Sequence, residues 1–176
     1  MRSVTVAVAL CLVVAGGLGA QEVQLRRGYR AIELGMSFEA AQQALRQDAG
    51  FAYRGEPDVS LRLSDGQSVI DSAGNGFIDR ALLQFASGEL YILALYLNRQ
   101  DLDYFALFGT LRERYGDPIE LSPSRALWRD QSTQIELERP LTVRYLDIQR
   151  FEEQRGQRQV ERALQDLNRE QFLEEF

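Results

Sequence analysis

The chain has 176 residues and a formal net charge of −6, from 26 acidic and 20 basic residues. Every basic residue is an arginine, and histidine is absent. Without a basic surplus to neutralise phosphates, nucleic-acid binding is disfavoured. Without histidine, the chain cannot build a Ser-His or Cys-His nucleophile pair, and it cannot bind a metal through imidazole.

The first twenty residues have the order of a secretory signal peptide: Arg2, an apolar stretch over residues 4–14, and small residues before Ala20. We therefore predict a signal peptide at 1–20 and a periplasmic or secreted protein. An uncleaved anchor is one alternative, although about 20 apolar residues are needed to cross a bilayer. A lipid on Cys11, which follows lipobox-like residues 8–10, is another. Cleavage would remove the one cysteine, and with it any disulfide or thiol nucleophile.

The first predicted helix lies within residues 34–51. Ser37 is a suitable N-cap, and the apolar residues after it follow the i, i+4 spacing of one helix face. Gly50 is expected to end this helix, and residues 55–58 form a turn that leads into the first strands.

Four strand-like runs follow this turn. Two short runs flank Asp65-Gly66, a pair typical of tight hairpins. Two longer runs, 77–85 and 90–97, flank a predicted four-residue loop at 86–89. The second long run is apolar from Leu90 to Leu97 apart from the phenol groups of its tyrosines, which predicts a central strand covered on both faces.

The second predicted helix follows, capped by Asp101 or Asp103 and ended by Tyr115-Gly116-Asp117-Pro118. Three further strand-like runs lie at 125–128, 133–138 and 141–148, and Pro140 places a tight turn before the last of them. From residue 149 the chain is charged and helix-prone. Its narrow apolar stripe around residues 160–167 predicts a helix lying on the edge of the domain.

These elements predict an α+β protein in which helices pack on one face of an antiparallel sheet. The expected domain spans residues 21–148, with possible modules at 29–98 and 101–148, and a C-terminal helix spans 149–176. Both modules read as a helix, a glycine stop and several strands, with a period of 66 residues when Leu45 is aligned with Leu111. A duplication explains this order, and so does common α+β construction.

The motif LGMSFEAAQQAL at residues 34–45, with Gly50 and Pro57 after it, carries a family resemblance. It resembles the helix start of BamE/SmpA-like outer-membrane lipoproteins and of tandem-repeat, β-lactamase-inhibitor-protein-like domains. In those families, helices pack on one face of an antiparallel sheet, and the other face or its loops hold a protein partner. The resemblance implies the same arrangement in this chain.

Residues 71–82, DSAGNGFIDRAL, imitate an EF-hand calcium loop, with Asp71, Asn75 and Asp79 at ligand positions. Leu82 stands where an EF-hand needs a bidentate glutamate, and strands rather than helices are expected on both sides. A weak calcium site is therefore the alternative to the preferred interpretation, which is a turn that starts a strand.

Glu136 and Glu138 are the one pair of carboxylates placed as an enzyme would place them. They alternate to the same face of a strand, about 6.5 to 7 Å apart, which overlaps the separation used in glycoside cleavage. The alternative is a solvated polar face, since Ile135 and Leu137 point the other way.

Three aromatic residues are candidates for a binding surface. Tyr91 and Tyr96 are expected on opposite faces of the central strand, and Trp128 begins the second group of strands. Aromatic residues of a sheet usually belong to the core. Beside Arg129 or Arg144, however, an exposed ring would form the aromatic-plus-arginine combination of interface hot spots.

We predict a non-enzymatic protein-interaction or assembly module of the bacterial cell envelope, with another envelope protein as its partner and no cofactor. The partner-binding candidates share an aromatic or apolar side chain: Tyr91, Tyr96, Trp128, Val160, Leu164, Leu167 and Phe172. The alternatives are an enzyme that acts on glycans through carboxylates and arginine, and a weakly calcium-binding exported protein.

Overall fold

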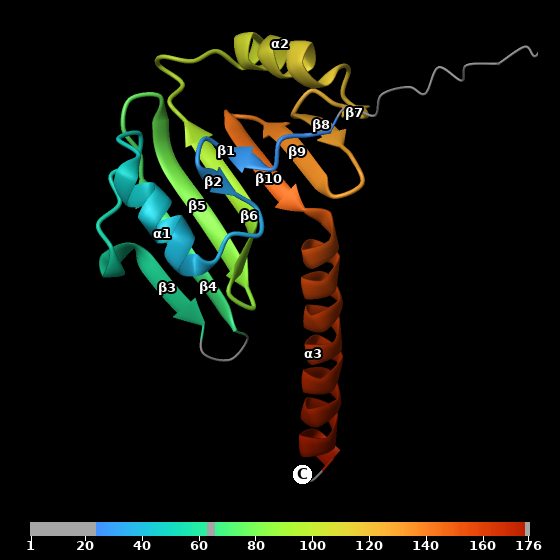
Figure 1. Cartoon of the computed structure of the whole chain (residues 1–176). Helices are drawn as coiled ribbons and strands as arrows, with labels where there is room; N and C mark the ends of the chain where they lie inside the picture. Colours follow the sequence, from blue (N-terminus) through green and yellow to red (C-terminus); the bar gives the residue numbers. More distant parts are fainter. Residues whose placement is uncertain (1–23, 63–65, 175–176) are drawn as a thin grey trace, which may run out of the picture.

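The computed structural model describes residues 24–62 and 66–174 (Figure 1). The predicted signal peptide, Cys11 and Asp65 lie outside these residues. The described chain forms a mainly antiparallel β-sheet with three α-helices, which confirms the α+β class. None of the helices in the described ranges is long and apolar enough to span a membrane.

The elements alternate between helices and groups of strands. The helices are α1 (Phe38–Gln47), the 3-10 helix η1 (Glu56–Asp58), α2 (Tyr104–Tyr115) and α3 (Ile148–Glu174). The strands are β1 (Gly28–Tyr29), β2 (Ile32–Glu33), β3 (Val59–Arg62), β4 (Gln67–Ala73), β5 (Ile78–Ala86), β6 (Glu89–Leu97), β7 (Glu120–Leu121), β8 (Arg125–Arg129), β9 (Thr133–Glu138) and β10 (Thr142–Asp147). Sequence patterns did not predict β1, β2 or β7, because two residues are too short to show a period.

Two four-stranded meanders make up the large sheet, whose strand order is β3-β4-β5-β6-β10-β9-β8-β7. Helix α1 precedes the first meander and α2 precedes the second. The last strand of each meander, β6 and β10, pair with each other antiparallel at the centre. Each half is thus one helix followed by four strands, while the duplication itself stays a hypothesis.

Both helix starts and the end of α2 follow the predicted capping residues, whereas α1 ends at Gln47 with Asp48 as its C-cap, before the predicted Gly50. The Ser37 hydroxyl accepts a hydrogen bond from the backbone N–H of Ala40, 3.2 Å away. The Asp103 carboxylate accepts bonds from Phe105 and Ala106 at the start of α2. Gly116 ends α2 with φ near 80°, a left-handed conformation that glycine adopts without steric cost.

The β5–β6 hairpin is tighter than predicted. Ala86 pairs with Glu89, so the turn contains two residues, Ser87 and Gly88, rather than four. Both turn residues have positive φ, as the right-handed twist of a two-residue hairpin requires. Strand β6 is buried from Leu90 to Leu95 and lies between β5 and β10, as its apolar sequence predicted.

The two faces of the sheet differ in what covers them. On one face, here the front face, side chains of α1 and α2 share the main core with strand residues such as Leu93, Leu137 and Tyr145. On the opposite back face, a small apolar cluster of β5, β6 and β10 packs only against Ile148 and Phe151 of α3. The main core is therefore on the front face, and much of the back face is left to polar side chains.

We expect the stability of this core to depend on the charge of Tyr145. Burial raises the pKa of Tyr145 to about 12, above the value near 10 of an unfolded chain. The stabilisation is therefore complete below pH 10 and is lost as pH rises from about 10 to about 12. The free energy of unfolding should fall in that window by about 3 kcal/mol.

Urea unfolding between pH 8 and 12 measures this loss, and Tyr145→Phe should reduce it. The chain contains no lysine, and its one cysteine lies in the predicted signal peptide, so after residue 20 the side chains that ionise in the basic range are arginine and tyrosine, and arginine stays charged. Tyr96→Phe, a change on the back face, is the matched control. An unchanged pH profile in Tyr145→Phe would contradict the assignment.

Candidate functional site

The first turns of α3, called here the root of the helix, are attached to the sheet through Asp147, the last residue of β10. One carboxylate oxygen of Asp147 accepts the backbone N–H of Arg150 at 3.0 Å, as an N-cap does. The other oxygen is 2.6 Å from the Arg27 guanidinium, which also donates to Thr133. Asp147 is buried, so one carboxylate sets the start of the helix and ties it to the N-terminal segment.

Further contacts hold the first two turns of α3. Arg150 forms an ion pair with Glu89 at the start of β6. The buried Gln154 accepts a hydrogen bond of 2.8 Å from Gln67 of β4. Together with the packing of Phe151 on the back face, these contacts fix the direction in which the helix leaves the sheet.

The distal part of α3 extends past the end of the sheet (Figure 1). The predicted stripe residues Val160, Leu164 and Leu167 are 61%, 54% and 56% exposed. Phe172 is exposed as well. The sequence had suggested that this stripe would lie on the domain edge, and the structure corrects that expectation.

The reason lies in the angular positions of the residues on the helix. With 3.6 residues per turn, Phe151, Arg158 and Arg162 form one row, and the stripe lies roughly opposite to it. Since Phe151 packs on the sheet, the stripe must point away from it. Gly156, a possible interruption, is accommodated within the continuous helix.

Tyr91 and Trp128 belong to the core rather than to a surface. Trp128 is 2% exposed, its ring packs near Phe108, and its indole N–H donates to the Gly116 carbonyl at 2.9 Å. Tyr91 is equally buried in the back-face cluster beneath α3. Burial removes both as direct partner contacts.

Tyr91 and Tyr96 lie on the same face of β6, contrary to the alternation that the sequence suggested. The ladder between β5 and β6 shifts register next to Tyr91, where a β-bulge inserts one extra residue. The shift turns Tyr91 toward the back face, where Tyr96 is half-buried below the Arg80 guanidinium. A single bulge is enough to reverse a prediction based on a period of two.

The calcium candidates are used in other contacts. Asp71 in β4 accepts two hydrogen bonds from Arg80 in β5, at 2.6 and 2.5 Å, and these bonds lower the pKa of its carboxyl. Asn75 lies in the turn between β4 and β5, and its side chain donates a hydrogen bond to the Ala49 carbonyl after α1. Asp79 lies in β5. Across residues 24–62 and 66–174, no group of three potential ligands is placed to hold a metal.

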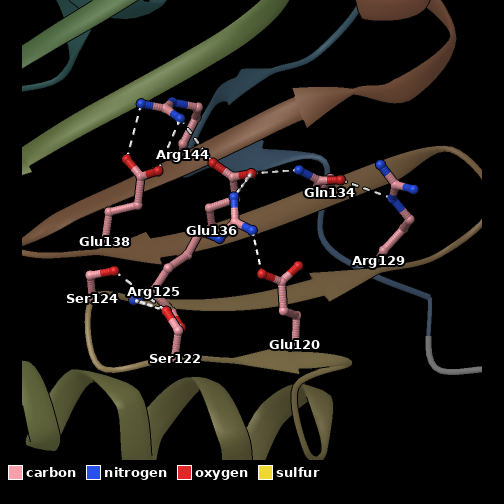
Figure 2. A network of polar contacts seen from close by, with 9 residues as sticks. All are labelled: Glu120, Ser122, Ser124, Arg125, Arg129, Gln134, Glu136, Glu138 and Arg144. Carbon is pink, nitrogen blue, oxygen red and sulfur yellow. Dashed lines mark hydrogen bonds and ion pairs between the residues drawn. The ribbon is translucent and has the colours of Figure 1, made fainter.

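The carboxylate pair of β9 belongs to a polar network on the back face (Figure 2). Arg144, directly opposite Glu136 on β10, bridges Glu136 at 2.8 Å and Glu138 at 3.0 Å. Glu136 also accepts a 2.5 Å hydrogen bond from Gln134, whose carbonyl oxygen accepts one from Arg129. Arg125 joins the network through Glu136, 3.9 Å from its guanidinium, and forms a second ion pair with Glu120.

This network neutralises its charges internally. Figure 2 shows glutamate and arginine side chains of β7, β8, β9 and β10 that pair across the strands, such as Glu120 with Arg125 and Glu136 with Arg144. Glu136 is buried, so removing a partner would leave a carboxylate with unsatisfied bonds. The arrangement suits a structural role, because an arginine occupies the space between the two carboxylates where a substrate would have to lie.

An exposed apolar surface near α2 was missed in the sequence. Phe105, Ile119 and Leu121 are each more than 60% exposed, and Phe105 and Leu121 line an open depression of about 510 Å³. The Arg139 guanidinium lies 4.1 Å from the Tyr104 ring in the same depression. The aromatic-plus-arginine combination thus occurs here and not beside Trp128. The sequence did not indicate this surface, because the two-residue strand β7 is too short to show a periodic pattern.

Comparison with known proteins identifies one relationship. A family model, described as the TP0088 domain, matches residues 27–157 and represents an uncharacterised family. The match ends within α3, close to where the helix leaves the sheet. The BamE/SmpA-like and β-lactamase-inhibitor-protein-like resemblance is not supported by this finding. No curated protein and no solved structure matches the chain.

We expect Asp147→Ala to loosen the root of α3. The change removes a helix cap and leaves Arg27 without its acceptor, and it should lower the free energy of unfolding by about 2 kcal/mol. Hydrogen exchange should show faster exchange in the first turns of α3. Asp166→Ala is the control, because among the described side chains Asp166 forms its ion pair with Arg169, on the exposed helix surface. Equal effects of the two variants would contradict the role of Asp147.

We expect millimolar calcium to leave the melting temperature unchanged, because Arg80 already occupies both oxygens of Asp71. Arg80→Ala would free these oxygens and serves as the comparison in a thermal unfolding series with and without calcium. A calcium-dependent rise in the melting temperature of the wild-type chain would show that the loop does bind the ion.

Proposed function

This chain belongs to the TP0088 domain family, and we propose that it is a non-enzymatic protein-interaction or assembly module of the bacterial cell envelope. In this proposal the sheet domain is a platform, and the distal part of α3 is the element that enters a partner protein. The partner is another envelope protein that supplies an apolar groove. The signal-peptide pattern of residues 1–20 supports the location.

The exposed stripe of Val160, Leu164 and Leu167 is the observation that carries this proposal. Three large aliphatic side chains at i, i+4 and i+7 form the anchor pattern of a helix that binds in a groove. Fully burying each such side chain contributes about 1.5 to 3 kcal/mol. The sheet does not cover the stripe, so this apolar area remains for a partner.

The length of the stripe favours a partner groove over a second copy of the helix. A self-associating coiled coil needs apolar a and d positions over at least three to four heptads. The stripe covers about one heptad, and residues 152–159, which directly precede it, contain no large apolar side chain. A short set of anchors is better suited to a preformed groove, which buries them without supercoiling.

The polar network supports the non-enzymatic interpretation. Glu136 and Glu138 are the most suitable carboxylates for glycan cleavage, and Arg144 lies between them. Each half contains one helix followed by four strands. We use this order as an analogy with β-lactamase-inhibitor-protein-like modules, which hold a protein partner.

A photo-crosslinking residue at Leu164 tests the proposal in cells that produce the protein. We expect one major crosslinked partner, identified by mass spectrometry and then purified for a binding measurement. Replacing Val160 and Leu167 by serine should weaken binding of that purified partner at least 100-fold, because two apolar anchors are lost.

Phe105→Ser with Leu121→Ser is the matched control, since it removes a similar exposed apolar area on the other side of the molecule. This control should bind like the wild type. A crosslinked product made of two copies of the chain would overturn the partner groove and indicate self-association. Unchanged binding by the Val160/Leu167 variant would overturn the role of the stripe.

A further inference from the structure

A groove separates the back face of the sheet from the middle of α3. Its volume is about 450 Å³, within the range of pockets that bind small molecules. Its lining combines apolar, amide and arginine side chains: Gln84, Tyr91, Ile92, Phe151, Gln154, Arg155, Arg158, Gln159 and Arg162. On the helix side, the groove is lined by the row of Phe151, Arg158 and Arg162, which lies opposite the apolar stripe on α3.

The charge of the groove is unusual for this chain. Three arginines line it and no carboxylate does, although acidic residues outnumber basic ones in the sequence. Arg155 is 3.5 Å from Glu152, but among the side chains that the structure describes, which exclude that of Glu161, no ion pair involves Arg158 or Arg162. Positive charge is therefore concentrated in the groove and is only partly neutralised by the protein.

The position of Arg158 is fixed by neutral acceptors. Its guanidinium donates to the Tyr91 hydroxyl at 3.2 Å and to the Gln67 side chain at 3.4 Å. Neither acceptor cancels its charge, and the five donors of a guanidinium exceed the two bonds that these groups accept. Arg158 is thus held at the groove with donors left for a ligand.

The floor of the groove is apolar. Tyr91 and Ile92 lie beneath it at 1% and 7% exposure, and Phe151 of α3, which packs against them, is half-buried and presents more of its apolar surface. A ligand that fills the groove must match an apolar floor and a row of arginines along one side. Such a ligand carries a ring or short hydrocarbon part together with an anionic group that accepts several hydrogen bonds.

We propose that this groove binds a small organic anion, with its carboxylate or phosphate group on Arg158 and Arg162 and its apolar part against the half-buried Phe151. Guanidinium groups bind both kinds of anion in a planar, bidentate geometry. The site lies on the opposite side of α3 from the partner-binding stripe, so it does not depend on the function proposed above.

Isothermal titration with matched probes tests the site on the full chain. Benzoate and benzamide have nearly the same shape and differ in charge, while phenyl phosphate replaces the carboxylate by a phosphate. We expect both anions to bind and benzamide to bind at least tenfold more weakly. Inorganic phosphate should bind more weakly than phenyl phosphate, because it cannot use the apolar floor. Whichever of benzoate and phenyl phosphate binds with the higher affinity shows which anionic group the site prefers.

Arg158→Gln with Arg162→Gln should reduce the affinity for the preferred anion at least tenfold, and higher salt should weaken wild-type binding. Arg169→Gln, which removes a charge from the same helix outside the groove, should bind like the wild type. Arg162→Gln alone provides a second variant, since it breaks no recorded contact of the fold. Circular dichroism checks that α3 is intact in each variant.

Equal affinity for benzamide and benzoate would overturn the anionic site, as would unchanged binding in the Arg158/Arg162 variant. The absence of binding by either anion would overturn it as well. The purified-partner measurement with the Val160/Leu167 variant is independent of these titrations, so failure of the groove and failure of the partner-binding stripe can be told apart.

Discussion

The antiparallel pairing of β6 with β10 is the interaction on which the rest of the structure depends. Five residue pairs, from Thr142 with Tyr96 to Leu146 with Ile92, join the two four-stranded halves. Each strand is the last of its half, and each contributes apolar side chains to the front-face core. Without this ladder, the most apolar strand of the chain would be an exposed edge with unpaired backbone groups. The pairing therefore creates both the continuous core and the two different faces of the sheet.

The same pairing decides where α3 can go. Since β10 is central, its end lies beside the start of β6, and Asp147 turns the chain directly into a helix at that point. Arg27, from the N-terminal segment, donates a hydrogen bond to Asp147 at this point. The first turns of α3 contact the sheet, and the distal part extends past the end of the sheet (Figure 1). The TP0088 domain match ends at residue 157, close to the same place.

Two chemically different sides of one helix follow from this geometry. The row that starts at Phe151 faces the sheet and brings arginines over an apolar floor, while the opposite row carries Val160, Leu164 and Leu167. A helix fully packed on the domain would have had its apolar side inward. In this protein only the first turns of α3 pack on the sheet. In the turns that follow, polar side chains face the sheet and the apolar stripe faces away from it.

Local chemistry was readable from the sequence alone: the Ser37 and Asp103 caps, the glycine stop of α2, and a β6 strand covered on both faces. Each depends on neighbours a few residues apart, which is why a single sequence is sufficient. The bulge at Tyr91, the burial of Trp128 and the outward direction of the stripe were decided by the tertiary structure. They depend on register between distant strands and on the point where α3 is attached. The sequence by itself determined the α-helices and the longer strands, and long-range pairing determined the two-residue strands and which side of each segment meets solvent.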